Sequence, residues 1–167
     1  VVDRHLRGRG IEIGALQDPI PLPRGARARY VDIAPTAELR GTYRRKARRH
    51  LVEVDIVDDG ERLATIADSS EDFVASNHFL EHCEDPIGAL RNMLRVVRPG
   101  GKVYLSVPDK RHTFDRERAS TTVDHLVRDH EGGPEQSRAG HYDEVARSAK
   151  GLTDPTAVAT AAEELRT

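Results

Sequence analysis

Five short runs rich in β-branched and aliphatic residues limit the possible folds of this chain more than any other feature. The runs occupy residues 10–14, 29–33, 51–55, 72–77 and 102–107. Each is short and largely apolar, as strands buried on both faces of a parallel sheet are. They therefore predict a sheet whose strands lie in the interior of the protein.

Helical patterns separate at least two pairs of these strands. Residues 86–97 place apolar side chains at helical spacing, with Asp85 as the predicted cap, Pro86 in the first turn and the Pro99–Gly101 run as the stop. Residues 36–49 form a weaker helical pattern. Strands that alternate with helices predict a doubly wound, Rossmann-like α/β fold, with three layers and a mainly parallel sheet.

The connection between the first two strands departs from this alternation. Pro19, Pro21 and Pro23 stand at every second position, and Gly25 follows them. Proline at this spacing cannot sustain the interior of a helix. We therefore predict an extended loop where a nucleotide-binding fold usually has its first helix.

Beyond Pro108 the strand pattern ends and short helices are expected. A break at 131–134 separates predicted helices at 122–130 and 142–149, and another is expected at 156–166. The histidines of this part, His125 and His130, lack further ligands at recognisable spacing. We expect them to occupy solvated helix or loop positions.

The length of 167 residues suits one domain with one core. We expect residues 1–110 to form a cofactor-binding α/β core, and residues 111–167 to add substrate-side loops and helices to the same domain. The only methionine is Met93, which indicates a trimmed chain or a fragment.

Composition and charge exclude several classes of protein. The net charge of −2 gives no general attraction to nucleic acid or to a membrane surface, and no apolar stretch reaches the length of a membrane span. The basic run at 43–50 is best interpreted as a solvated helix face. With Cys83 as the only cysteine, no internal disulfide can form, and a cytoplasmic location is expected.

The candidate binding residues follow the predicted strands. In an open parallel sheet, ligands bind outside the carboxyl ends of the strands, near the point where the strand order reverses. Asp32 is placed where a carboxylate accepts both ribose hydroxyls, and Asp55 with Ile56 suits an adenine ring. The candidate cofactor-binding residues are Glu12, Gly14, Ala15, Asp32, Ile33, Asp55, Ile56, Asn77 and His78.

Residues 10–109 resemble the class I S-adenosylmethionine-dependent methyltransferases. The strongest match is the run Asp72–His82, followed by Ala89-Leu90 and by Arg95–Gly101. It includes Leu80-Glu81-His82, the triplet that the small-molecule type carries after its fourth strand. Glu12-Ile13-Gly14 is similar to the start of the glycine motif of this family, and Asp32 to its ribose-binding acid.

The resemblance implies that S-adenosylmethionine is the cofactor and that its methyl group moves to a small molecule by an SN2 displacement. Two features differ from the family pattern: Leu16 stands at the second glycine position, and the proline loop replaces the first helix. The sixth and seventh strands of the family sheet are not found before Thr167, so the terminal part of the fold is expected to be missing.

A general base is needed only if the acceptor is a hydroxyl or a protonated amine. The candidates near the strand ends are His78, Asp109 and His112. His78 and His82 are four residues apart, but the strand that ends before His78 argues against a shared helix face. No metal site is predicted.

Three functions are compatible with the sequence. The leading one is methylation of a small-molecule substrate, without nucleic-acid or membrane partners. The second is a non-catalytic binding or assembly domain that retains the fold, which Leu16 and the missing helix favour. The third, a nicotinamide-dependent enzyme, is disfavoured because Gly-x-Gly-x-x-Gly is absent. The methyl acceptor and the oligomeric state are left open, and a homo-oligomer is compatible with the sequence.

Overall fold

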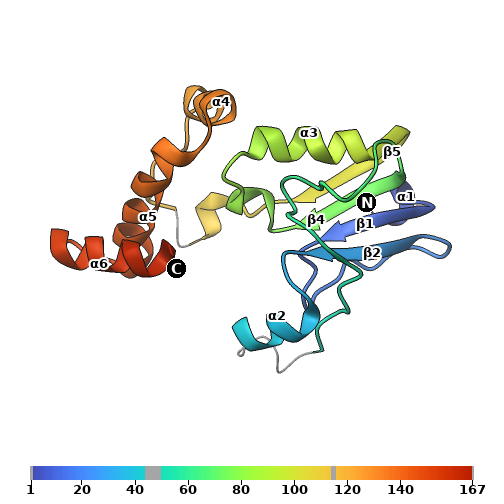
Figure 1. The fold of residues 1–167 in the computed structure, drawn as a ribbon, viewed down its shortest axis with the longest axis horizontal. Helices are drawn as coiled ribbons and strands as arrows, with labels where there is room; N and C mark the ends of the chain where they lie inside the picture. The colour runs from blue at the N-terminus through green and yellow to red at the C-terminus, as the bar shows by residue number, and fades with distance from the viewer. Residues whose placement is uncertain (1, 44–49, 114–115, 167) are drawn as a thin grey trace. The chain divides into compact units, whose positions relative to one another are not determined.

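The computed structural model describes residues 2–43, 50–113 and 116–166 (Figure 1). The chain divides into two compact units, Val1–Val107 and Pro108–Thr167. Each unit is described by itself below.

The first unit is built on a five-stranded sheet in which every neighbouring pair of strands is parallel. The strands are β1 (Arg9–Ile13), β2 (Arg27–Asp32), β3 (Ile56–Val57), β4 (Glu71–Asn77) and β5 (Val97–Ser106). Their spatial order is β3-β2-β1-β4-β5, so the chain reverses its direction of winding between β1 and β4. The predicted parallel α/β fold is confirmed.

Both faces of the sheet are covered. On one face, α3 (Pro86–Val96) lies along the strands (Figure 1) and contributes Met93 to a core that includes Ile11 and Val74. On the other face, Phe73 packs in a cluster with Leu6, next to α1 (Val2–His5), and with Ile20 of the proline loop. The predicted loop, which contains no helix, thus forms much of the layer on that face.

Helix α3 begins as the sequence predicts. The Asp85 side chain accepts a hydrogen bond from the backbone N–H of Gly88 at 2.8 Å, and Pro86 occupies the first turn. Near the end of the helix, the Arg95 guanidinium binds three backbone oxygens of the preceding connection, at 2.9–3.1 Å, and the carboxylate of Asp68 at 2.6 Å. This one side chain fastens the connection between β3 and β4 to α3.

The third strand differs from the prediction. Residues 51–54 are not in a strand, and β3 is limited to Ile56–Val57. The backbone N–H groups of Val52 and Val54 donate to the Leu16 carbonyl and to the Thr36 hydroxyl, each at 2.8 Å, and not to β2. Backbone pairing with β2 begins at Asp55, whose N–H donates to the Tyr30 carbonyl at 2.9 Å and whose side chain accepts the Tyr30 N–H at 2.8 Å.

Two further short elements belong to the first unit. Helix α2 spans Thr36–Thr42, which confirms the start of the helix predicted at 36–49, while residues 44–49 lie outside the described residues. A single turn of 3-10 helix, η1 (Leu80–His82), follows β4.

The second unit contains the 3-10 turn η2 (Lys110–His112) and three helices, α4 (Val123–Gly132), α5 (Glu135–Lys150) and α6 (Pro155–Arg166). The break predicted at 131–134 separates α4 from α5. Helices α5 and α6 pack through a small core of Ala146, Val158 and Ala161. Among the described residues, no helix has the length and apolarity needed to cross a membrane.

Candidate functional site

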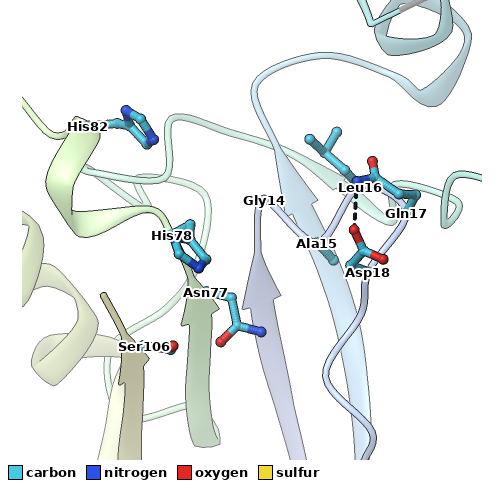
Figure 2. Close-up of a pocket in the computed structure, with 9 residues that line it drawn as sticks. All are labelled: Gly14, Ala15, Leu16, Gln17, Asp18, Asn77, His78, His82 and Ser106. Atoms are coloured by element: carbon cyan, nitrogen blue, oxygen red, sulfur yellow. Dashed lines mark hydrogen bonds between the residues drawn. The ribbon is translucent and has the colours of Figure 1, made fainter. Parts of the chain in front are cut away.

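A pocket of about 530 Å³ lies at the carboxyl ends of β1, β4 and β5 (Figure 2). Its lining residues are Gly14, Ala15, Leu16, Gln17, Asp18, Asn77, His78, His82 and Ser106. The volume is within the range of small-molecule sites. Because β1 and β4 are the strands between which the winding reverses, the pocket occupies the position where open α/β sheets bind their ligands.

The turn after β1 brings bare backbone to the pocket. Gly14 has a φ of +67°, and a Cβ added there would meet nothing within 4 Å, so its backbone is open to a ligand. Leu16 has a φ of +48°, a left-handed conformation that favours glycine. Its carbonyl accepts the backbone N–H of Val52 at 2.8 Å. Leucine therefore adopts a backbone conformation in which glycine would be unstrained.

The opposite wall is formed by the turn after β4. Figure 2 shows the Asn77 side chain between the ends of β4 and β1. His78 has a φ of +51°, and its backbone N–H donates to the carbonyl of Ser106 at 2.9 Å. The His78 ring is largely exposed, and its Nδ1 lies 3.1 Å from Oε1 of Glu81. The ring is therefore held from one side, and Nε2 is the nitrogen left for a ligand.

Glu12 is buried beneath the proline loop and does not line the pocket. Its Oε1 accepts the backbone N–H of Ile20 at 2.8 Å, whereas Oε2 has no hydrogen-bond partner among the described residues. Burial raises the pKa of this carboxyl to about 7, against a smaller lowering effect of the Ile20 hydrogen bond. Through this hydrogen bond, Glu12 contacts the proline loop and not the pocket.

Asp32 lies on the neighbouring strand, outside the pocket lining. The backbone N–H of Gly14 donates to the carbonyl of Val31 at 2.9 Å, so the end of β2 adjoins the turn after β1. Burial raises the pKa of the Asp32 carboxyl, although a hydrogen bond from the Ile33 backbone opposes this. Ile33 and Val57, at the ends of adjacent strands, are 68% and 50% exposed. An acid beside exposed apolar side chains suits a ribose with its attached base.

The residues predicted for the adenine contact have other partners. Asp55 binds the backbone of Tyr30, and Ile56 packs against the core of the sheet. Val57 is the exposed apolar residue at the end of this strand. The sequence reasoning missed it because the strand was predicted at 51–55, whereas β3 is Ile56–Val57.

Two catalytic candidates, Asp109 and His112, belong to the second unit. The Asp109 carboxylate accepts hydrogen bonds from Nε and Nη2 of Arg111, at 3.0 and 2.5 Å, and these bonds lower the pKa of Asp109. His112 ends the turn η2. Neither residue is among those that line the pocket.

Of the residues predicted from the sequence, four line the pocket: Gly14, Ala15, Asn77 and His78. The lining also includes Gln17, Asp18, His82 and Ser106, which were not predicted as binding residues. Ser106 lies within the strand predicted at 102–107 and is the last residue of β5. Gln17 and Asp18 were not, because their place depends on the path of the proline loop.

A parallel sheet with a pocket at its winding reversal, bare backbone after β1 and an acid after β2 defines a Rossmann-like domain for an adenosine-containing ligand. Residues 8–105 match the sequence model of the family described as "Methyltransferase domain". The chain therefore belongs to this family of class I methyltransferases.

Curated relatives match the same part of the chain. The ubiquinone biosynthesis O-methyltransferase of Xanthomonas oryzae pv. oryzae (strain PXO99A) is 37% identical over 83 residues, which cover 49% of this chain and 34% of the relative. The same enzyme of strain MAFF 311018 matches equally well. The chain thus spans about a third of the length of these relatives.

Solved structures of methyltransferases are also similar. A methyltransferase of Thermotoga maritima, described as dependent on S-adenosylmethionine, has 23% identity and a TM-score of 0.45, over 66% of this chain and 49% of its own. Phosphoethanolamine N-methyltransferase 1 of Haemonchus contortus, solved with phosphoethanolamine and S-adenosylhomocysteine, has 20% identity and a TM-score of 0.42. The shared part covers 60% of this chain and 22% of that enzyme.

Proposed function

We propose that this chain transfers the methyl group of S-adenosylmethionine to a hydroxyl group of a small molecule. The observation that carries the proposal is the pocket between the ends of β1 and β4, in a chain of the methyltransferase-domain family. The relative described as an O-methyltransferase supports a hydroxyl acceptor. When bound, the cofactor supplies a methyl group already activated for displacement.

The residues present fit this cofactor. The open backbone at Gly14 would take its amino-acid part, and the Asp32 carboxylate, at the end of β2, would accept two ribose hydroxyls. Ile33 and Val57 offer apolar surface for the base. In a displacement of this kind, the main task of the protein is to hold the nucleophile in line with the bond that breaks.

His78 is the proposed general base. Because Glu81 engages Nδ1, the free Nε2 can accept the proton of an acceptor hydroxyl. Asp109 and His112 remain proposals as well, for a role on the acceptor side. The Arg111 hydrogen bonds favour the charged form of Asp109, which makes it a better partner for a cationic acceptor than a proton acceptor.

The test is a calorimetric titration of the chain with S-adenosylmethionine, S-adenosylhomocysteine and, as a control, NADH. We expect saturable binding of the first two only. Asp32→Ala should weaken binding at least about 100-fold, since two hydrogen bonds to a charged group, each about 1.5–3 kcal/mol, are lost. The matched variant Glu53→Ala, at an exposed acid of the same unit, should bind as the wild type does.

Two outcomes count against the proposal. Absence of binding by the folded chain rules out the methyltransferase function for residues 1–167. Tight binding without turnover, over a panel of phenols, alcohols and amines, favours the non-catalytic binding domain instead. The left-handed conformation of Leu16 supports an active methyltransferase, because the leucine at this glycine position keeps a glycine-like backbone.

A further inference from the structure

A cluster of three metal-ligating side chains lies in the second unit and shares no residue with the pocket lining. His125 and Asp129 are four residues apart on α4, and His141 comes from α5. Nε2 of His125 lies 3.0 Å from Nε2 of His141 and 3.1 Å from Oδ2 of Asp129. The sequence predicted a solvated position for His125, but the fold places it beside Asp129 and beside His141, a partner from the next helix.

The carboxylate of this cluster is buried. Asp129 is 8% exposed and is the only buried residue among the described residues of α4. The two imidazoles are partly buried, and their rings meet edge to face with centroids 5.0 Å apart. A buried carboxylate requires a compensating positive charge or hydrogen bonds, because leaving it unpaired costs several kcal/mol.

The spacing of the three ligand atoms matches a metal shell. In a tetrahedral site with nitrogen and oxygen ligands at about 2.0–2.1 Å, the ligand atoms lie roughly 3.3 Å apart. The two measured separations are close to this value, and all three atoms lie within 4.8 Å of one another. Without an ion, His125 Nε2 has either one proton or one lone pair for two neighbours, whereas a cation satisfies all three groups.

The surroundings also favour a cation. Oε2 of Glu144 lies 4.0 Å from the Nδ1 of His141, on the side of the ring away from the cluster. The same oxygen accepts a hydrogen bond from Nη2 of Arg118 at 2.6 Å. Carboxylates placed behind a metal-binding imidazole orient the ring and strengthen its binding.

The apolar contacts of α4 are few. The core of this unit contains Ala146, Val158 and Ala161, with Leu152 packed against it, and no described residue of α4. Val123 and Val127 of α4 are exposed. The cluster of His125, Asp129 and His141 is a polar link between α4 and α5.

We propose that His125, Asp129 and His141 bind a divalent transition-metal ion, best matched by zinc, which joins α4 to α5. Two imidazoles and one carboxylate suit zinc and related metals and are poor ligands for magnesium. Three protein ligands leave a fourth position for water or a substrate group. This site is independent of the proposed methyl transfer.

The test is a titration of the chelator-treated full chain with Zn²⁺, in the presence of excess Mg²⁺. We expect one zinc per chain. Asp129→Asn and His141→Gln should each weaken zinc binding at least about tenfold, because one ligand of three is lost. His130→Gln, which replaces another histidine of α4, should change the affinity by less than about threefold.

A second measurement needs no variant. Saturating Zn²⁺ should protect His125 and His141 from modification by diethyl pyrocarbonate, read out by peptide mass spectrometry, and leave His130 reactive. Failure to bind zinc stoichiometrically, equal effects of all three substitutions, or no protection in the wild type would each overturn the proposal. The cluster would then be a hydrogen-bonded group that shares protons.

Discussion

Glu12 couples protonation to folding at the level of a single residue. Its carboxyl is 1% exposed, and burial raises its pKa from 4.5 to about 7. The unfolded chain releases this proton at lower pH than the folded chain does. The stability that this group contributes is therefore complete below about pH 4.5 and is lost as the pH rises through 7.

We expect Glu12→Gln to remove this pH dependence. Glutamine keeps an oxygen for the Ile20 N–H and has no charge to bury. Relative to the variant, the wild type should lose up to about 3 kcal/mol of unfolding free energy between about pH 5 and pH 8. Urea unfolding at several pH values measures this difference, with Glu53→Gln as the control. Parallel pH profiles for wild type and Glu12→Gln would contradict the assignment.

At this scale the sequence predicted some positions and missed others. Gly14 and Asn77 were predictable because they follow strands directly, and strand ends meet at one edge of the sheet. The role of Glu12 was not, since its contact with Ile20 depends on how the proline loop folds back. The third strand was predicted too early because the N–H groups of Val52 and Val54 bind groups outside the sheet, which periodicity cannot show.

Strands β1 and β4 lie so close together at Gly10 that a larger side chain there would clash. A Cβ added to Gly10 would lie 2.3 Å from the backbone oxygen of Phe73. Gly10→Ala should therefore cost about 2 kcal/mol or more of stability, as overpacking does. Gly41→Ala, in α2 with nothing within 4 Å of the added methyl, should be neutral or stabilising by up to about 1 kcal/mol. Thermal unfolding of the two variants checks the contrast, and equal effects would contradict it.

The attachment of the β3–β4 connection to α3 depends on Arg95. Its hydrogen bonds to three carbonyls and to Asp68 require the planar guanidinium. We expect Arg95→Lys to lower the free energy of unfolding by about 2 kcal/mol or more. Arg98→Lys keeps a positive charge beside Asp72 and alters one ion pair whose guanidinium is exposed, so it should cost less than about 1 kcal/mol. Denaturant titration of the two variants measures their free energies of unfolding. Similar decreases would show that Arg95 does not hold the connection.

The elements themselves were largely predictable. Four of the five strands and the start of α3 follow from apolar periodicity and from Asp85 and Pro86 as start signals. Helix α5 was predicted only at 142–149, yet it spans Glu135–Lys150. Its first half is polar and lacks the apolar stripe by which helices are recognised.

For the whole molecule, the division into two units leads to a test. All nine residues that line the pocket, and Asp32, lie within residues 1–107. A chain that ends at Val107 should therefore unfold cooperatively and bind S-adenosylhomocysteine within about threefold of the full chain. Calorimetric titration of both chains measures this. A much weaker affinity of the folded short chain would mean that residues beyond 107 contribute to the cofactor site.

The same division explains why the cluster of His125, Asp129 and His141 escaped the sequence reasoning. Spacing along the chain reveals pairs on one helix, such as His125 and Asp129, but not a partner that the next helix brings back. The parallel sheet was predictable because each of its elements carries a local signal. The contact between α4 and α5 carries none.

The proline loop after β1 has little conformational entropy left to lose. Each of Pro19, Pro21 and Pro23 fixes its own φ, and the Ile20 N–H is held by Glu12. Such a segment samples few alternatives even in the unfolded chain. The part of the pocket wall next to this loop is therefore already ordered before a ligand binds. Ordering it reduces the binding free energy very little.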